Sequence, residues 1–142
     1  SELPVEVLSI LPSHLLSRLP PDVLLNLPPL RNSIGMQLKL IPAGRFQMGS
    51  PASEVGRLND ETQHRVQITK PFYLSVHEVT QEQYERVMGE NPSYFSALGE
   101  GKGYVSGIET SQFPVENMSW NHAVTFCSQL SVQSGVPYRL PT

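Results

Sequence analysis

Apolar and polar residues alternate in four short stretches of the chain, which is the pattern of half-buried β-strands. The predicted strands lie at residues 36–40, 45–48, 65–69 and 72–79. In the second of them, Phe46 and Met48 fall on one face. The polar stretch 49–62, which contains Gly, Asn, Asp and Glu, indicates a surface loop between the second and third strands.

Two helices are predicted from their start and stop signals. Thr80-Gln81-Glu82-Gln83 matches a capping box, in which the hydroxyl and the side chain three residues later satisfy unpaired backbone donors, and Gly89 ends that helix. Ser119 starts a second helix, which Gly135 closes. The predicted buried face of this second helix is Trp120, Ala123, Cys127 and Leu130, which follow helical spacing.

Short strands combined with two separate helices favour an α+β domain rich in loops. Residues 91–112 form a long predicted loop, a length that usually marks a function or an insertion. Its glycines at 99, 101 and 103 lack the following Lys-Ser/Thr and the strand–turn–helix context of a phosphate-binding loop. We therefore expect no nucleotide site there.

Residues 1–31 differ from the rest of the chain, because a Leu-Pro pair recurs every eight residues. The pairs begin at Leu3, Leu11, Leu19 and Leu27. Proline starts helices well and the residue before it prefers extended backbone, so each block predicts one or two helical turns or an extended chain. We interpret 1–31 as a linker that joins further domains, with docking of its leucines on its own domain or on a partner as the alternative.

Composition and charge exclude several classes of protein. The 142 residues carry 10 Lys and Arg against 13 Asp and Glu, so no basic excess exists for binding nucleic acid. No apolar run approaches the roughly 18 residues of a membrane span. Cys127 is the only cysteine, which excludes an internal disulfide and a metal site built from two thiolates.

Few side chains have the spacing of a reactive site. The histidines are His14, His64, His77 and His122. His64 and His77 could lie on adjacent strands, but no third metal ligand is evident, so surface or hydrogen-bonded imidazoles are the expectation. In a regular strand His77 and Glu78 point to opposite faces and cannot share a pocket.

Two further residues are candidates for reactive groups. Glu78 precedes the first helix, and we expect it to be half-buried and bonded to backbone donors at the strand–helix junction. Cys127 lies among apolar helix positions, which predicts a structural core thiol, or one paired with a distant cysteine, rather than a reactive thiolate.

A series of short motifs resembles the formylglycine-generating enzyme (sulfatase-modifying factor) family over residues 32–142. The motifs are Asn32-Ser33-Ile34-Gly35-Met36, Ile41-Pro42-Ala43-Gly44, Met48-Gly49-Ser50, Pro71-Phe72-Tyr73-Leu74, Glu78-Val79-Thr80, Phe113-Pro114-Val115, Ser119-Trp120-Asn121 and Tyr138-Arg139-Leu140-Pro141-Thr142. The resemblance implies that Glu78, Thr80, Trp120, Cys127 and Arg139 are structural motif positions. His122 departs from the acidic residue that is frequent there in the family, which implies a change on the helix surface.

The resemblance also implies a fold, an activity and cofactors. The fold is a variant of the C-type lectin fold, incomplete here at its C-terminus. Family members oxidise a sulfatase cysteine to formylglycine with oxygen and a copper ion held by two cysteine thiolates, and some bind calcium. The resemblance places the copper pair and the calcium ligands in the family's C-terminal half, so no catalytic or metal-binding residue is expected in this chain.

Two hypotheses of function follow. In the first, the chain is the N-terminal half of an oxidase that acts on a sulfatase polypeptide. In the second, it belongs to a non-catalytic lectin-like binding module of a multidomain bacterial protein, or to an iron-dependent sulfoxide-synthase relative. The start at Ser1 and the end at Leu140-Pro141-Thr142 lead us to expect a piece of a longer protein.

Overall fold

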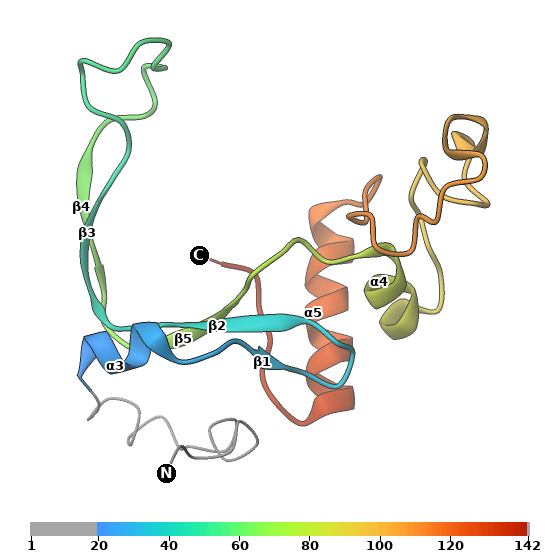
Figure 1. The fold of residues 1–142 in the computed structure, drawn as a ribbon, viewed down its shortest axis with the longest axis horizontal. Helices are drawn as coiled ribbons and strands as arrows, with labels where there is room; N and C mark the ends of the chain where they lie inside the picture. The colour runs from blue at the N-terminus through green and yellow to red at the C-terminus, as the bar shows by residue number, and fades with distance from the viewer. Residues whose placement is uncertain (1–19, 142) are drawn as a thin grey trace. The chain divides into compact units, whose positions relative to one another are not determined.

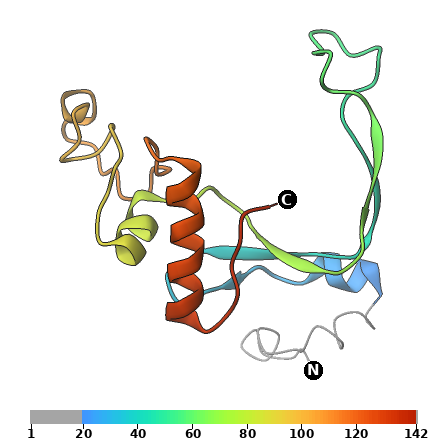
Figure 2. The same ribbon diagram turned by 180° about the vertical axis from the view of Figure 1, so that it is seen from behind.

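The computed structural model describes residues 20–141, which divide into two compact units. Unit 1 comprises the described residues up to Leu30 together with Leu38–Leu74. Unit 2 comprises Arg31–Gln37 together with the described residues from Ser75 onward. Figure 1 and Figure 2 show the elements of each unit from opposite sides.

The three-stranded sheet has the order β1-β2-β5, and the boundary between the units passes through each strand, one residue from its end. Its strands are β1 (Leu30–Arg31), β2 (Gln37–Ile41) and β5 (Phe72–Ser75). In β2, buried Leu38 and Leu40 alternate with half-exposed neighbours. This alternation is the pattern that predicted a strand at residues 36–40, and the prediction is confirmed.

A short helix of unit 1 covers part of this sheet. Helix α3 (Pro21–Asn26) places Leu24 against Leu40, and the two side chains are only 4% and 2% exposed. Leu27 and Tyr73 pack around this pair. The helix stops at Leu27, whose backbone is extended (φ −62°, ψ 136°) before Pro28, as expected for a residue that precedes proline.

The described part of the predicted linker up to Leu30 belongs to unit 1, where Leu24 packs on Leu40. Residues 20–31 contain one helical turn and a half, a buried leucine and strand β1. The first two eight-residue blocks, with His14, lie outside the described residues. The packing of Leu24 agrees with docking of this stretch on its own domain, and the linker role of residues 1–31 stays a prediction.

The second sheet of unit 1 is a hairpin of β3 (Gly44–Met48) and β4 (His64–Ile68), paired antiparallel with Phe46 opposite Val66. The loop that joins the strands closes at Gly49, where φ is +94°. A Cβ on Gly49 would lie 2.8 Å from the carbonyl oxygens of Glu61 and Thr62, so only glycine fits. Both predicted strands and the surface loop between them are confirmed.

Unit 2 is built on a pair of helices, α4 (Gln81–Met88) and α5 (Trp120–Ser134), which lie side by side in both views (Figures 1 and 2). The rings of Tyr84 and Phe126 stack between them, with centroids 5.5 Å apart and planes 10° apart. Tyr84 and Leu130 are 1% and 0% exposed. Both helices begin and end at the predicted capping residues.

The buried face of α5 differs from the prediction at Trp120, which is 71% exposed. Phe126 is buried instead, and Ala123 and Cys127 are half-buried. The reason is length: α4 has 8 residues and α5 has 15, so α4 covers about 12 Å of a helix about 22 Å long. Trp120 lies in the first turn, where the described part of the chain leaves it exposed.

The strand predicted over residues 72–79 ends early, at Ser75. Val76 N still donates to Gln37 O (2.9 Å), but Ser75 Oγ then donates to the carbonyl of His77 (2.6 Å) and turns the chain away from the ladder. The long segment 91–112 is not wholly irregular, since it contains the 3-10 helix η1 (Lys102–Val105). Across residues 20–141, no helix has the length and apolar content needed to cross a membrane.

Candidate binding pocket on unit 2

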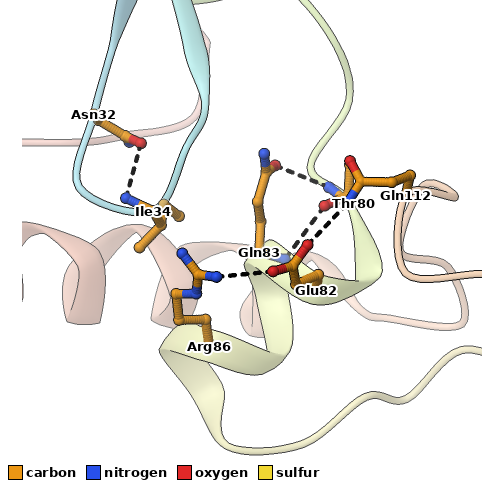
Figure 3. A network of polar contacts seen from close by, with 7 residues as sticks. All are labelled: Asn32, Ile34, Thr80, Glu82, Gln83, Arg86 and Gln112. Atoms are coloured by element: carbon orange, nitrogen blue, oxygen red, sulfur yellow. Dashed lines mark hydrogen bonds and ion pairs between the residues drawn. The ribbon is translucent and has the colours of Figure 1, made fainter.

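The start of α4 is fixed by hydrogen bonds around Thr80 (Figure 3). Thr80 Oγ1 accepts from Gln83 N (3.3 Å) and Gln83 Oε1 accepts from Thr80 N (3.1 Å), which completes the predicted capping box. Thr80 also forms an isolated antiparallel bridge with Pro114, and Val115 N donates to Val79 O (2.9 Å). The segment around Pro114 is therefore held against the first turn of the helix.

The side chain of Gln81 is buried directly behind this junction, with 1% of its surface exposed. Its Nε2 donates to the carbonyl of Phe95 (3.1 Å), and its Oε1 accepts from Asn91 Nδ2 (3.0 Å). Its backbone N–H donates to the carbonyl of Phe113 (2.9 Å). Gln81 thus links the helix start to the beginning of the long loop through its side chain and to Phe113, just after the loop, through its backbone N–H.

Unit 2 also contains a tight turn at residues 32–36. Asn32 Oδ1 accepts from the N–H groups of Ile34 (3.2 Å; Figure 3) and Met36 (2.9 Å), and Gly35 has φ +85°. Asn32 Nδ2 donates to the hydroxyl of Tyr138 (3.3 Å), which ties the turn to the chain after α5. The turn and the helix start are both firmly positioned.

Between these two features unit 2 has an open pocket of about 460 Å³. Its lining comes from the turn, the segment after β5, the start of α4 and the end of the long loop. The lining residues are Arg31, Gly35, Met36, Gln37, Ser75, His77, Glu78, Thr80, Gln83, Gln112 and Pro114. The surface they present is mostly polar.

Three ionisable side chains line the pocket without a partner of their own. Arg31, His77 and Glu78 are exposed, and none of their side chains forms a hydrogen bond or ion pair with another of residues 20–141. In contrast, the neighbouring carboxylate of Glu82 accepts from Arg86 (2.8 Å) and from Gln112 (2.8 Å; Figure 3). The pocket therefore offers one cation, one anion and an imidazole to a ligand.

Three predictions about these residues are corrected by the structure. His77 and Glu78 do share a pocket, because the strand ends at Ser75 and strict alternation stops there. Glu78 is exposed rather than half-buried, and no backbone donor of the described residues bonds its carboxylate. His64 lies in β4, which pairs with β3 and not with β5, so it is not on a strand adjacent to His77.

His122 has a definite structural role at the start of α5. Its backbone N–H donates to Ser119 Oγ (3.2 Å), and its Nδ1 accepts from Ser119 N (3.4 Å). The imidazole thus completes a second capping box, the task that an acidic or amide side chain usually performs at this position. The departure from the family pattern at His122 is a change on the helix surface, as predicted.

The remaining motif positions lie away from the pocket lining. Cys127 is a half-buried free thiol on α5, and burial raises its pKa above the ordinary value. Trp120 is exposed, and Arg139 Nη1 donates to the carbonyl of Leu140 (3.1 Å). Among residues 20–141 no group of three or more His, Cys, Asp or Glu side chains is placed to hold a metal ion.

The lone thiol does not fit a copper site made of two thiolates. Cys127 has no second cysteine to pair with in this chain, and its raised pKa keeps it protonated at neutral pH. The described residues therefore offer a polar binding pocket and a structural thiol, and no redox centre is derived from them.

Comparison with known families decides where this chain belongs. The family model of the sulfatase-modifying factor enzyme 1-like domain matches residues 30–142. The chain belongs to this family. The family match begins at β1, so it includes the whole lining of the pocket.

Solved structures and a curated protein are similar to parts of the chain. PvdO from Pseudomonas aeruginosa is similar in fold (TM-score 0.61, 24% identity), covering 81% of this chain and 48% of PvdO. Treponema denticola variable protein 1 is also similar (TM-score 0.58, 28% identity), covering 77% of this chain and 35% of that protein. The protein named chaperone protein LppX from Paenibacillus barcinonensis is 34% identical over 68 residues, 47% of this chain and 20% of its own length. The chain thus spans half or less of each of these proteins.

Sequence reasoning missed Gln81, Gln112 and Arg31 as contributors to the site. Gln81 is visible in the sequence only as the second residue of the capping box, because its partners lie 10 and 14 residues further along. Arg31 stands at the end of the stretch interpreted as a linker. A polar residue on the inner face of a predicted amphipathic helix was the one available signal for Gln81.

The state of Cys127 gives a prediction for its chemistry. We expect Cys127 in the folded chain to react with iodoacetamide more slowly at pH 8 than in the chain unfolded by urea. A raised thiol pKa leaves less thiolate at any given pH, so the rate should climb at higher pH in the folded chain than in the unfolded one. Alkylation followed by mass spectrometry across pH 7–10 measures this, and superimposable pH profiles for the two states would show that the thiol is not desolvated.

Proposed function

We propose that unit 2 binds a polypeptide segment in its polar pocket, as the binding part of a sulfatase-modifying factor-like domain. The observation that carries the proposal is the convergence of Arg31, His77 and Glu78 on one pocket with no partners among the described residues. Charged groups that face a rigid pocket without neutralising each other are available to a ligand. The turn at 32–36 and the capped start of α4 keep them in place.

The chemistry of the lining favours a peptide over other ligand classes. The amides of Gln37, Gln83 and Gln112 supply both donors and acceptors, which suit the alternating N–H and C=O groups of a peptide backbone. The lining contains no Phe, Tyr or Trp ring on which a sugar could stack. Glu78 lines the same pocket as Arg31, and its negative charge disfavours a polyanion such as a nucleotide.

The fold supports the same proposal. We place the domain as a variant of the C-type lectin fold, a scaffold that presents loops for recognition, and the low content of regular structure agrees with that placement. In this proposal Cys127 packs on α5, and copper and calcium are bound by residues outside the 142 of this chain. The leucine- and proline-rich N-terminal stretch joins the domain to others in a multidomain bacterial protein.

A second candidate concerns the whole protein to which the chain belongs. The family match over residues 30–142 favours oxidation of a sulfatase cysteine to formylglycine with oxygen and copper. The two candidates are compatible, because an oxidase of this kind must also hold the peptide that it modifies. They differ in whether the bound peptide is changed.

Peptide binding is tested by replacing Glu78. We expect Glu78→Gln to weaken binding of a synthetic sulfatase-type peptide containing Cys-x-Pro-x-Arg by up to about fivefold, because an exposed pair with the peptide arginine contributes ~0.2–1 kcal/mol. Glu85→Gln, an exposed carboxylate on α4 outside the pocket, is the matched control and should leave affinity unchanged. Calorimetric titration at low and moderate salt measures both. No peptide binding, or equal effects of the two substitutions, contradicts the proposal.

Conversion of the same peptide distinguishes the candidates. We expect the whole protein, loaded with copper in the presence of oxygen, to convert the peptide cysteine to an aldehyde that mass spectrometry detects. A Cys127→Ser variant of the whole protein should convert it at an unchanged rate, because Cys127 does not serve the reaction. Binding without conversion supports a non-catalytic module, and loss of conversion in the serine variant overturns the structural role of Cys127.

A further inference from the structure

The contact between α3 and the sheet defines a small leucine-binding site on unit 1. Leu24 packs on Leu40, and Leu27 and Tyr73 complete the cluster. Lys39 Nζ donates to the carbonyl of Leu27 (2.5 Å), the last residue before Pro28. We use the term leucine-binding site for Lys39, Leu40 and Tyr73 together. The site thus binds two leucines three residues apart and a carbonyl that precedes a proline.

The sequence bound there occurs three times in the chain. The copies are Leu8-Ser9-Ile10-Leu11-Pro12, Leu16-Ser17-Arg18-Leu19-Pro20 and Leu24-Leu25-Asn26-Leu27-Pro28. All three have the form Leu-x-x-Leu-Pro and are separated by eight residues. The features that the leucine-binding site contacts are therefore the features that the copies share.

We propose that the leucine-binding site recognises the Leu-x-x-Leu-Pro motif itself, and that residues 16–20 exchange with residues 24–28 as its occupant. The contacts support this, because they use two leucine side chains and one backbone carbonyl, which all three copies have. Exchange shifts the register of the N-terminal stretch by eight residues. The length of chain between the domain and whatever precedes it then changes without loss of the docking contact.

The cost of the shift is small. With residues 24–28 bound, three residues lead from Leu27 to Leu30 in β1; with residues 16–20 bound, eleven residues lead there from Leu19. Loop-closure probability falls as the −3/2 power of loop length. The longer connection therefore lowers the population of the state with residues 16–20 bound by about sevenfold. The third copy is also favoured by Pro21 in the first helical turn and by Asn26 Nδ2, which donates to Asp22 O (2.7 Å). The third copy is the resting occupant, and the second is within reach.

The same chain is the expected source of the occupant. A copy attached by a connection of about ten residues has an effective concentration in the millimolar range, well above that of a second molecule in dilute solution. Binding between molecules is therefore the alternative that the experiment must detect.

Crosslinking from Lys39 tests the proposal. Lys39 is replaced by a photoreactive lysine analogue in the 142-residue chain, and crosslinked peptides are mapped by mass spectrometry. We expect crosslinks mainly to residues 24–28 in the otherwise unchanged chain. Leu24→Ala should weaken binding of residues 24–28 to the leucine-binding site by about thirtyfold or more, as truncation of other buried leucines does. This loss exceeds the roughly sevenfold cost of the longer connection. In that variant the crosslinks should move to residues 16–20.

Matched variants and a competitor cover the remaining outcomes. Leu16→Ala alone should leave the crosslinks at 24–28. A synthetic peptide of residues 11–20 at millimolar concentration should crosslink to the chain whose only change is the photoreactive analogue at residue 39, and this result does not depend on the folding of any leucine variant. The proposal is overturned by loss of crosslinks in Leu24→Ala with no gain at 16–20, or by no crosslink to the peptide. It is also overturned by crosslinks between isotopically labelled and unlabelled chains, which would mean that the site binds a second molecule.

Discussion

One buried amide, the side chain of Gln81, determines how unit 2 is held together. An unpaired amide at 1% exposure costs roughly 1–3 kcal/mol for each unsatisfied group, so its hydrogen bonds to Asn91 and Phe95 are obligatory. Those bonds attach the long loop to the helix pair, whereas most of the loop's large hydrophobic side chains, such as Leu98 and Tyr104, are exposed. Ser93, which is only 1% exposed, continues the network, because its Oγ accepts a hydrogen bond from Glu116 N (3.2 Å). The loop is thus ordered by polar contacts that start at one helix position.

The pocket follows from this arrangement. The loop returns to the start of α4 at Pro114, and the return brings Gln112 beside the turn at residues 32–36. Arg31, His77 and Glu78 line this pocket and have no side-chain partner among residues 20–141. A rigid frame with free charges is suited to recognition, and the single thiol of Cys127 is not suited to binding copper by two sulfur ligands. Membership of the sulfatase-modifying factor family and a binding role for this part of the domain are therefore consistent.

The sequence predicts what depends on neighbouring residues. The capping box at Thr80, the helix start at Ser119, the strands at 45–48 and 65–69 and the glycines that end the helices are all predicted, because each is encoded within four or five residues. It does not predict what depends on distant partners. The exposure of Trp120 follows from the shortness of α4. The presence of His77 and Glu78 in one pocket follows from a strand that ends early. Leu24 was foreseen as a docking leucine only as an alternative, because its partner Leu40 lies beyond the repeat.

The central claim is that the side-chain amide of Gln81 attaches the long loop, residues 91–112, to the helix pair. The most direct test is residue-resolved hydrogen exchange on a Gln81→Met variant, which keeps the size of the side chain and removes both of its hydrogen bonds, with Gln129→Met on the exposed face of α5 as the control. The account predicts at least a tenfold loss of protection at the amides of Phe95 and Gly101 in the first variant, with the amides of α5 less affected and the control unchanged. Protection of the loop that is the same in both variants and in the unchanged chain would contradict it.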